Sequence, residues 1–370
     1  MTYMVNVLGI ETSCDETAVG VVTDGHVLRS IIIASQIDIH AQYGGIVPEL
    51  ASRQHIRDIS ATVNSSLKTA GLNLGDVDIV SATYGPGLAG SLITGLNTAK
   101  ALAMSLGVPF IGSNHLEGHL YASWLKESGE LPDSEPGFPL ACLIASGGHT
   151  DLILMEDHGN YKLVGRTRDD AAGEAFDKAA RVLGLGFPGG REIQKAAEQK
   201  IGENDLELPR AWMKGTLDFS FSGVKTALLH MAQNKGIYPL DQCQFTDDQV
   251  RVLVNQMSHA FQEAVVDVMV EKVVTMSEQY HAKGILIGGG VAANSRLRAK
   301  VVDRSNIPVL IPPPVLCTDN GAMIAACAYY QYQRGEQYGF ELDVNPSLPR
   351  GEVCSLRMRA YCARIVLQKF

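Results

Sequence analysis

The sequence lacks the features that mark several large classes of protein. Its seven cysteines are odd in number and widely spaced, with no C-x-x-C pair, so neither a disulfide framework nor a zinc ribbon is predicted. No apolar run approaches the ~20 residues of a membrane span, and the N-terminal apolar stretch stops at Glu11 without a basic flank. We therefore expect a cytoplasmic protein with no membrane association.

Charge is also scarce, and positive charge especially so. Charged residues make up 19% of the chain and apolar residues 46%, which is typical of a soluble globular protein. The balance of 31 basic and 40 acidic residues gives a net charge of −9, which argues against a broadly basic surface. Residues 350–370 differ, since five basic residues and one acidic residue give +4 there and leave −13 for the rest. A solvated tail is the simplest interpretation, and contact with a nucleic acid or a partner is the alternative.

The length and the pattern of apolar residues predict two α/β domains. Residues 5–22 and 140–156 share one plan, in which an apolar strand leads through a polar loop into a second apolar strand. Segments with helical character alternate with such strands, at 48–70, 91–106, 169–184 and 247–279. The repeated plan indicates two structurally similar halves.

We divide the chain at the ends of these predicted elements. The first α/β lobe is placed at residues 1–112 and the second at 113–345, with a C-terminal helix that returns toward the first lobe. Residues 346–370 form an appended basic tail. The acidic segment 127–138, rich in Pro and Gly, is the best linker candidate, and GLGFPGG at 184–190 is interpreted as a turn.

Two histidines stand four residues apart in NHLEGHLYASW. On a helix, His115 and His119 would project from one face, as two metal ligands require, although a chance pair of surface histidines is the alternative. Asn114 is placed to cap this helix, and Glu117 to complete a capping box. Because Glu117 lies two residues after His115, roughly 200° round the helix, the pattern differs from the H-E-x-x-H of metallopeptidases, and that function is disfavoured.

Asp319, in CTDNGAMIA, lies where a helix is expected to begin after a strand. A carboxylate there is either the N-cap of the helix or a third metal ligand on a loop that faces a cleft. Together with the two histidines it would leave coordination positions open. Such a site suits a divalent metal, iron or zinc, that also binds a substrate oxygen.

Glycine is more frequent than usual, at 37 of 370 residues, and part of it is concentrated in loops. ASGGHT offers Ser146, Gly147, Gly148 and His149 directly after a buried strand, so that backbone amides can approach an anion. An ordinary hairpin turn is the alternative. GGGVAANSR presents the same choice, with Asn294 available to bond a ribose or base. Neither loop is a Walker A motif.

A row of charges follows one face of the helix expected at 169–184. Its members at i, i+3, i+4 and i+7 are Glu174, Asp177, Lys178 and Arg181. A solvated, salt-bridged face is the first interpretation of such a row. The glycine-rich turn that follows would instead let Asp177 and Gly190 line one wall of a nucleotide cleft.

Several long segments of the chain occur in a characteristic order. They are GIETSCDETAVGVV, GGIVPELASRQH, GPGLAGSLITG, NHLEGHLYA, ASGGHTDL, AFDKAARVLGLGFPGG, FSFSGVKTAL, GGGVAANSRLR and CTDNGAMIA. Together they resemble the Gcp/TsaD family of tRNA adenosine threonylcarbamoyltransferases, from about residue 6 to about residue 347. The tail from residue 350 lies outside this resemblance.

The resemblance implies a fold and a reaction. The implied fold has two similar α/β lobes of the actin, Hsp70 and sugar-kinase (ASKHA) type around a central nucleotide cleft. The implied enzyme transfers the threonylcarbamoyl group of threonylcarbamoyl-AMP to the N6 amine of the adenosine 3′ of the anticodon, in tRNAs that read codons beginning with A. AMP is released.

The resemblance also implies roles for particular residues. The implied metal ligands are His115, His119 and Asp319. The implied substrate-binding residues are Ala145, Ser146, Gly147, Gly148, His149, Asp177, Gly190 and Asn294. Ala145 stands where the family often has valine, which should not affect backbone contacts. A role of Glu11 and Asp15 in orienting the attacking amine or the metal's water is our own hypothesis.

Cofactors and partners follow from the same resemblance. We expect one divalent metal per subunit, iron before zinc, and an adenylate or ATP-type nucleotide as substrate. Besides tRNA and threonylcarbamoyl-AMP, the expected partners are a paralogous subunit of the same fold (TsaB-like) and a small ATPase (TsaE-like). The alternatives are an ATP-dependent phosphotransferase of the same fold, a metallopeptidase, and a non-catalytic scaffold, against which the retained ligand residues argue.

Overall fold

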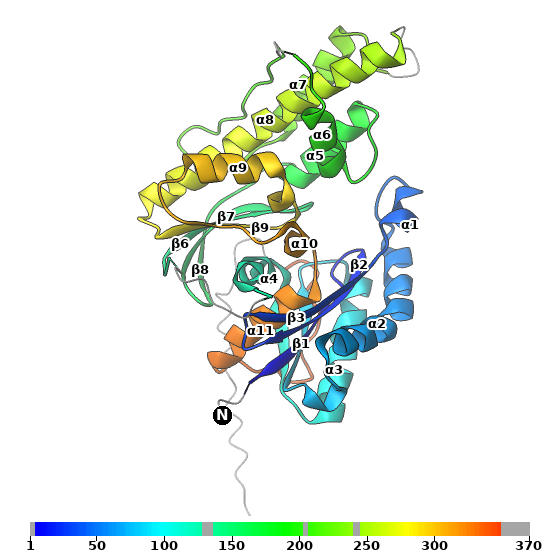
Figure 1. Ribbon diagram of the computed structural model, residues 1–370, viewed down its shortest axis with the longest axis vertical. Coiled ribbons are helices and arrows are strands. Elements are labelled where there is room, and N and C mark those ends of the chain that lie inside the picture. The colour runs from blue at the N-terminus through cyan, green and yellow to red at the C-terminus, as the bar shows by residue number, and fades with distance from the viewer. Residues whose placement is uncertain (1–3, 128–135, 203–205, 240–244, 349–370) are drawn as a thin grey trace, which may run out of the picture.

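The computed structural model describes residues 4–127, 136–202, 206–239 and 245–348. In these residues ten strands form two five-stranded sheets, stacked along the long axis of the molecule in Figure 1. The first sheet, in the order β3-β2-β1-β4-β5, consists of β1 (Asn6–Glu11), β2 (Glu16–Thr23), β3 (Val27–Ser35), β4 (Ile79–Gly85) and β5 (Phe110–Asn114). The second, in the order β10-β9-β6-β7-β8, consists of β6 (Leu140–Ala145), β7 (Thr150–Asp157), β8 (Asn160–Arg166), β9 (Gly284–Gly288) and β10 (Val309–Leu310).

The two sheets are built on the same plan. In the first, β1 and β2 form an antiparallel hairpin, β3 pairs antiparallel with β2, and β4 pairs parallel with β1. In the second, β6, β7, β8 and β9 repeat these relations in the same order. The structure confirms both predicted hairpins, and it adds β3 and β8, which the sequence pattern did not indicate.

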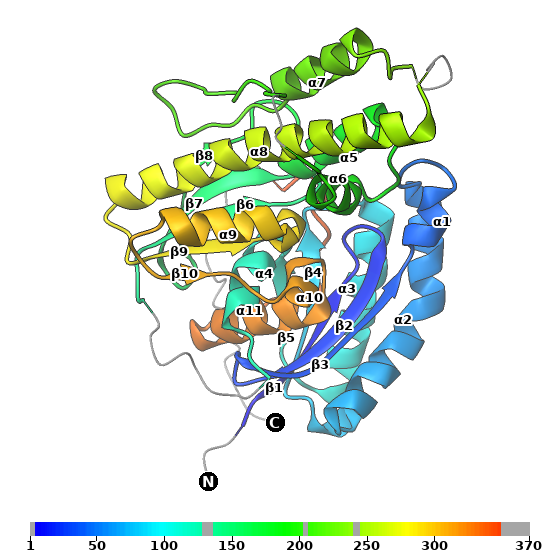
Figure 2. The same ribbon diagram turned by 45° about the horizontal axis from the view of Figure 1, so that its top comes forward.

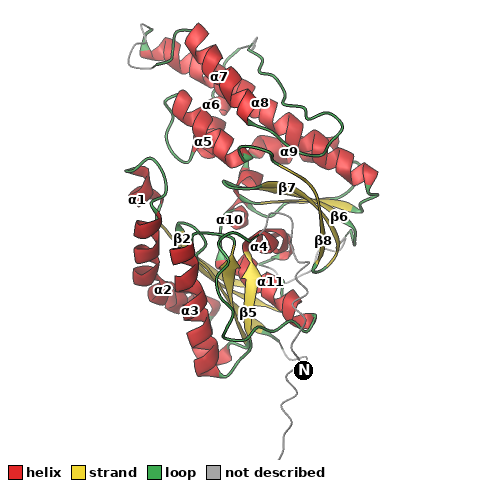
Figure 3. Cartoon of the chain, turned by 180° about the vertical axis from the view of Figure 1, so that it is seen from behind, coloured by secondary structure: helices red, strands yellow, loops and turns green. Residues whose placement is uncertain are grey.

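Helices cover both sheets and also separate them (Figures 2 and 3). The helices are α1 (Ile37–Ala41), α2 (Pro48–Ala70), α3 (Ala89–Leu106), α4 (His115–Tyr121), α5 (Ala172–Val182), α6 (Gly189–Glu198), α7 (Ser222–Asn234), α8 (Asp247–Gln279), α9 (Ser295–Arg304), α10 (Pro314–Cys317) and α11 (Gly321–Gln333). α2 and α3 pack on the outer face of the first sheet, and α5 to α9 on that of the second. α4 and α11 lie between the sheets in a shared buried core. The predicted two-lobed α/β fold is confirmed.

The N-terminus of α11 lies directly against the first hairpin. A Cβ atom on Gly9 would be 2.2 Å from the carbonyl oxygen of Gly321, and one on Gly20 would be 2.3 Å from the Ala322 nitrogen. Only glycine permits so close an approach of two backbones. The contact fixes the loop before α11, which carries Asp319, between the two lobes. Part of the glycine excess therefore serves close packing and not only the loops.

The ends of two long helices agree with the sequence prediction. α2 has Pro48 in its first turn and ends at Gly71, whose φ of 69° is left-handed, as is common at helix C-termini. α8 follows a capping box between Thr246 and Gln249. The turn predicted at 184–190 is partly wrong, because α6 already begins at Gly189.

Some predictions concern residues outside the described part of the chain. Residues 128–135 of the proposed linker lie there, as does the basic tail from residue 349 onward. Within the described residues, no helix combines the length and the apolar composition that crossing a membrane would require.

Candidate metal and substrate site

The two histidines lie on α4, the short helix between the sheets. Asn114 caps this helix as predicted, because its side-chain oxygen accepts a hydrogen bond from the Leu116 N–H at 2.8 Å. His115 and His119 are both buried, and their ring centroids are 4.7 Å apart. They are therefore not a chance pair of surface histidines.

Glu117 does not complete a capping box on α4. Its buried carboxylate instead accepts a hydrogen bond from the Cys327 thiol of α11, with 3.5 Å between Oε2 and Sγ. Burial raises the pKa of Glu117 to about 7, against the opposing effect of the Arg334 charge. The predicted capping role is wrong because α11 packs against α4 and takes up this side chain.

Asp319 approaches the histidines from the loop before α11. Its Oδ1 lies 3.3 Å from His119 Nε2 and 3.6 Å from His115 Nε2. Ligand atoms of the three residues all lie within 4.8 Å of one another. The N-cap of α11 is Asn320, whose side chain accepts a hydrogen bond from the Met323 N–H at 2.9 Å. Of the two interpretations of Asp319, the N-cap is therefore wrong, and the carboxylate faces the histidines.

Glu11, at the end of β1, lies behind the cluster. Because side chains alternate along a strand, Ile10 packs toward α2 and α3 whereas Glu11 faces α4. Its Oε2 lies 3.1 Å from His115 Nδ1 and accepts a hydrogen bond from the Thr83 hydroxyl, while its Oε1 accepts one from the Ser13 N–H. These contacts orient His115. Thr83 was not identified from the sequence as a partner of Glu11. The available signal was its position as a polar residue on a buried strand.

Asp15 lies in the same loop, between β1 and β2, but is only partly buried. Burial raises the pKa of its carboxyl, against a hydrogen bond from Cys14. The loop is held from outside by His55 of α2, whose Nε2 lies 3.0 Å from the carbonyl oxygen of Cys14. Glu11 therefore contacts the metal-ligand candidate His115 directly, whereas Asp15 is half-buried in the same loop.

Opposite charges stabilise each other within the cluster. Burial by itself would lower the pKa of His115, but the charges of Asp319 and Glu11 raise it to about 9. Burial would likewise raise the pKa of Asp319, but the two histidines hold it at about 2. The pKa of Glu11 is also lowered, since His115 outweighs the effect of burial. The site therefore favours ionised carboxylates, and two imidazoles with a carboxylate suit iron or zinc.

His119 provides a test of whether these residues fit a metal. The side chain is fully buried, yet neither ring nitrogen makes a hydrogen bond of good geometry among the described residues, although Nε2 lies 3.3 Å from Asp319 Oδ1. Leaving a buried polar group without a partner costs about 1–3 kcal/mol. Coordination through Nε2, beside Asp319, would satisfy one of these atoms. The three residues therefore fit the metal that the resemblance implies.

The loop between β6 and β7 has the open backbone that an anion site needs. The Ser146 N–H donates to the carbonyl oxygen of His149 at 2.9 Å and closes a tight turn. A Cβ atom added at Gly147 or Gly148 would meet nothing within 4 Å among the described residues. Ala145, at the end of β6, is buried. The charge of His149 contributes to the lowered pKa of Asp319.

The glycine loop after β9 packs against the same turn. Gly289 has a φ of 88°, and a Cβ there would lie 2.4 Å from the Ala145 carbonyl oxygen. Asn294 caps α9 by accepting a hydrogen bond from the Leu297 N–H at 3.0 Å, and it donates to Gln262 Oε1 at 2.8 Å. The side-chain oxygen and nitrogen of Asn294 thus each already make one hydrogen bond within the protein. A ribose or base could bind them only in addition to these bonds.

The charged residues predicted to form a row on α5 contact different parts of the protein. Lys178 pairs with Glu174 at 2.8 Å, as a solvated face predicts. Asp177 accepts a hydrogen bond from the Gly189 N–H at 2.7 Å, and burial raises the pKa of its carboxyl. Arg181 donates to the carbonyl oxygen of Gly44, in the loop after α1, at 3.2 Å. Asp177 therefore holds the start of α6 and places Gly190 in the first turn of that helix.

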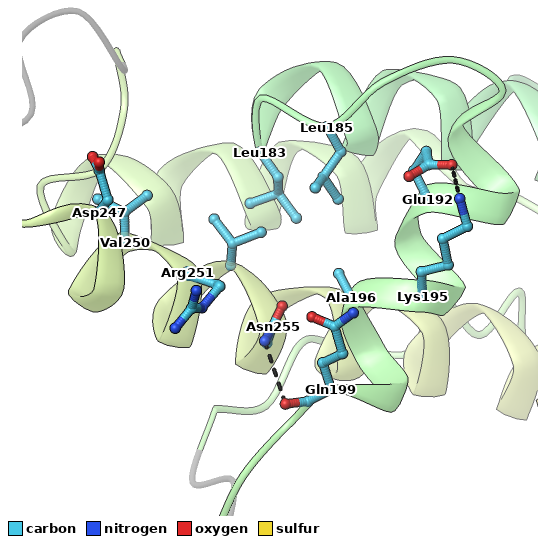
Figure 4. A pocket seen from close by; sticks show the side chains of 11 residues that line it. Leu183, Leu185, Glu192, Lys195, Ala196, Gln199, Asp247, Val250, Arg251 and Asn255 are labelled. Carbon is cyan, nitrogen blue, oxygen red and sulfur yellow. Dashed lines mark hydrogen bonds and ion pairs between the residues drawn. The ribbon is translucent and has the colours of Figure 1, made fainter.

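A pocket of about 460 Å³ lies elsewhere, between α6 and the N-terminal part of α8 (Figure 4). Leu183, Val250 and Val254 are among the residues that line it, as are Glu192 and Lys195, which form an ion pair at 2.7 Å. None of the predicted site residues lines this pocket. This pocket is therefore separate from the candidate metal and substrate site.

Two duplicated lobes with the site between them define the class of actin-like ATPase folds. Solved structures agree with this class at the level of the fold. Component A of the (R)-2-hydroxyglutaryl-CoA dehydratase of Acidaminococcus fermentans is 13% identical with a TM-score of 0.51, covering 89% of this chain and 99% of that one. Full-length HypF is 12% identical with a TM-score of 0.55, covering 90% of this chain and 56% of that one.

The chain belongs to the TsaD family of tRNA N6-adenosine threonylcarbamoyltransferases, whose family model matches residues 27–326. The enzyme of that name from Dehalococcoides mccartyi is 50% identical over 342 residues, which cover 92% of this chain and 98% of that protein. The enzyme of Thermomicrobium roseum is 51% identical over 353 residues, with coverages of 93% and 96%. This protein is therefore a transferase that modifies tRNA.

Proposed function

We propose that this enzyme transfers the threonylcarbamoyl group of threonylcarbamoyl-AMP to the N6 amine of the adenosine 3′ of the anticodon, position 37, in tRNAs that read codons beginning with A. AMP leaves. The observation that carries the proposal is the cluster of buried His115 and His119 with the half-buried Asp319, in a fold that also has an open glycine turn at Gly147 and Gly148. The mixed anhydride already contains a good leaving group, so the site needs mainly to align it with the amine and to stabilise charge on its oxygens.

His115, His119 and Asp319 would hold one divalent metal, for which iron is our first choice and zinc the second. When bound, the metal supplies Lewis acidity toward carbonyl or phosphate oxygens of the substrate. Glu11 keeps the imidazole of His115 oriented through Nδ1, which leaves Nε2 directed at Asp319. The geometry thus favours a positioning role for Glu11, and we retain Asp15 as the residue that orients the attacking amine.

The adenylate would lie along the loops that meet at Ala145. The turn from Ser146 to His149 offers its backbone to the threonylcarbamoyl and phosphate oxygens, because its two glycines have no side chain to shield the amides. Gly190 and Asn294 would line the nucleoside side, and Asp177 would act by holding the start of α6.

The proposed assembly includes a paralogous subunit of the same fold and a small ATPase, in the cytoplasm. Exposed apolar side chains support a partner on the outer face of the first lobe. Ile56 of α2 is 66% exposed and Ile93 of α3 is 44% exposed, on neighbouring helices that a second α/β lobe could cover.

The proposal is tested by following the modified nucleoside. Unmodified tRNA is incubated with threonine, bicarbonate, ATP and the adenylate-forming enzyme, with and without this chain, and its nucleosides are analysed by mass spectrometry. We expect threonylcarbamoyladenosine only in the complete mixture. Its absence with every combination of partners would refute the proposal, and a phosphorylated acceptor formed from ATP would favour the phosphotransferase.

The same assay tests the metal ligands. We expect His119→Ala and Asp319→Ala to lose bound metal and to reduce transfer by about 1,000-fold or more, because the Lewis acid is lost. His230→Ala removes an exposed histidine of α7 and should leave both properties unchanged. Full transfer by a variant without bound metal, measured by elemental analysis, would overturn the assignment.

A further inference from the structure

Three consecutive backbone carbonyls in the loop after β1 are each held by a different helix or its cap. The Ser13 oxygen accepts a hydrogen bond at 2.8 Å from the N-cap residue of α3. The Asp15 oxygen accepts one at 3.2 Å from the N–H of Gln36, the N-cap residue of α1. The Cys14 oxygen, between them, lies 3.0 Å from Nε2 of His55, on α2. The backbone that carries the Asp15 side chain is therefore fixed by three separate elements.

The contacts of His55 determine which of its ring nitrogens carries the hydrogen. A carbonyl oxygen can only accept, so Nε2 donates to Cys14 and Nδ1 keeps a free electron pair. Nδ1 accepts a hydrogen bond from the Thr17 hydroxyl at 2.8 Å. The His55 side chain is completely buried, and this burial lowers its pKa below the ordinary value. A neutral ring with one N–H satisfies both neighbours.

A second buried histidine extends this network along α1. The side-chain nitrogen of Gln36 lies 3.4 Å from His55 Nδ1, and its side-chain oxygen lies 3.2 Å from His40 Nε2. Because an amide oxygen can only accept, His40 also carries its hydrogen on Nε2, and its Nδ1 accepts from the Val47 N–H at 3.3 Å. Gln36, His40 and His55 are each at most 1% exposed. Their hydrogen bonds all run in one direction, from Val47 to the Cys14 carbonyl.

Such a network holds its end points more narrowly than apolar packing does. A buried polar group that loses its partner costs about 1–3 kcal/mol, whereas an apolar side chain tolerates small shifts with little loss. Displacing the Cys14 carbonyl would break its bond to His55 and leave two buried polar groups unpaired. The peptide that leads into Asp15 is thus confined to one orientation.

The other end of the network lies next to a contact between the two lobes. The carbonyl oxygen of Gly44, shortly before Val47, accepts a hydrogen bond from Arg181 of α5 at 3.2 Å. α1 accordingly lies on the side of the first lobe that faces α5 and α6 (Figure 2). The network therefore connects this contact with the loop that carries Asp15.

We propose that the network of His55, Gln36 and His40 positions the loop after β1 so that the carboxylate of this loop can orient the attacking amine. That carboxylate is Asp15, and for its role the inference rests on the proposed function. The metal ligands lie on α4 and before α11, and the expected adenylate contacts lie in the second lobe. The network therefore serves the amine and not the binding of metal or adenylate.

The test compares H55F with H55Q in the full-length chain, in the complete reaction mixture. H55F keeps a planar ring but has no donor for the Cys14 carbonyl, whereas H55Q retains an N–H donor. For H55F we expect kcat to fall about tenfold and the KM for threonylcarbamoyl-AMP to stay within about twofold, because a misplaced orienting group slows the reaction without weakening ground-state binding. Metal content should match the wild type. H55Q should recover most of the rate. An unchanged kcat in H55F, a loss of metal, or equal losses in both variants would overturn the proposal.

Hydrogen exchange gives a readout that does not depend on activity. We expect the amides of residues 12–17 to exchange about tenfold faster in H55F. The matched control is H26F, which alters a histidine in the turn at the opposite end of β2 and should change neither exchange nor kcat. Equal effects of H26F and H55F would overturn the proposal.

A milder variant covers the case in which H55F does not fold. T17V keeps the shape of the side chain but removes the hydroxyl that bonds His55 Nδ1, and we expect its kcat to fall about threefold with the KM unchanged. Wild-type kcat and exchange in T17V would then overturn the proposal. Faster exchange in H55F, beside a wild-type chain that forms no threonylcarbamoyladenosine, would refute the proposed function alone.

Discussion

The loops that follow β1 and β6 occupy equivalent places in two lobes of the same plan, yet the space around their central residues differs. The first loop is anchored by close contacts, since Gly9 of β1 touches the backbone of α11 and Glu11 and Ser13 both contact His115. Around the second, Gly147 and Gly148 have no described atom near the position of a Cβ.

The contrast explains how one duplicated fold supplies two functions. A loop anchored by close contacts can hold metal ligands in a fixed geometry, whereas a loop with exposed glycines can receive an anionic substrate. Glycine is required in both, for close packing in the first and for access in the second. Replacing a glycine is therefore expected to destabilise the fold in the first lobe and to impair substrate binding in the second.

The largest expected effect is on the packed side. Gly9→Val would place a branched side chain where even a Cβ lies 2.2 Å from the Gly321 oxygen. We expect the free energy of unfolding to fall by about 4 kcal/mol or more, because α11 must move away from the first sheet. Urea denaturation followed by circular dichroism measures this, and a loss below about 1 kcal/mol would contradict the packing argument.

A smaller effect is expected from the residue that orients His115. Glu11→Gln keeps the volume of the side chain but removes the charge that faces Nδ1. We expect affinity for iron or zinc to fall about 10- to 100-fold, since the imidazole is less well oriented and less basic. Competition titration with a chelating dye measures the affinity. Ser146→Ala, in the open loop, serves as the control and should bind metal like the wild type.

The end of β7 that lies away from the glycine loop is packed against aromatic side chains. This packing predicts that the free energy of unfolding depends on pH. His158 follows β7 and stacks on Tyr330, with ring centroids 4.1 Å apart. Burial lowers the pKa of His158 to about 4, from 6.5 in the unfolded chain. The unfolded state thus binds an extra proton between these values, so the stabilisation is complete above pH 6.5 and is lost as the pH falls toward 4.

The ring is only partly buried, so we expect a loss of about 1–2 kcal/mol over this range instead of the full value of the shift. Urea denaturation at a series of pH values measures it. His158→Phe keeps the stacking and should flatten the dependence between pH 4 and 6.5. An equally steep dependence in this variant would assign the effect to other groups.

The smallest effect is expected in the open loop. Gly147→Ala adds one methyl group where nothing lies within 4 Å among the described residues, and the backbone is not left-handed. We expect the free energy of unfolding to stay within about 0.5 kcal/mol of the wild type. Thermal denaturation is the measurement. A loss comparable to that of Gly9→Val would remove the distinction between the two loops.

Local signals in the sequence predicted much of the fold and part of the site. The hairpins, α2 and α8 follow from the apolar pattern along short segments, and the structure adds the local end signals at Gly71 and at the Thr246 capping box. The start of α6 at Gly189 escaped prediction, because the Asp177 carboxylate that accepts its N–H lies on another helix. Glu117 was misassigned for the same reason.

The sequence by itself determined that His115 and His119 share one face of a capped helix, because spacing and capping are local properties of the chain. Its residue pattern left Asp319 undecided between cap and ligand, and only the resemblance implied the latter. The tertiary structure decided it, since the contact of α11 with Gly9 and Gly20 brings Asp319 to histidines roughly 200 residues earlier. Such long-range packing depends on shape and burial, which periodicity along one segment does not encode.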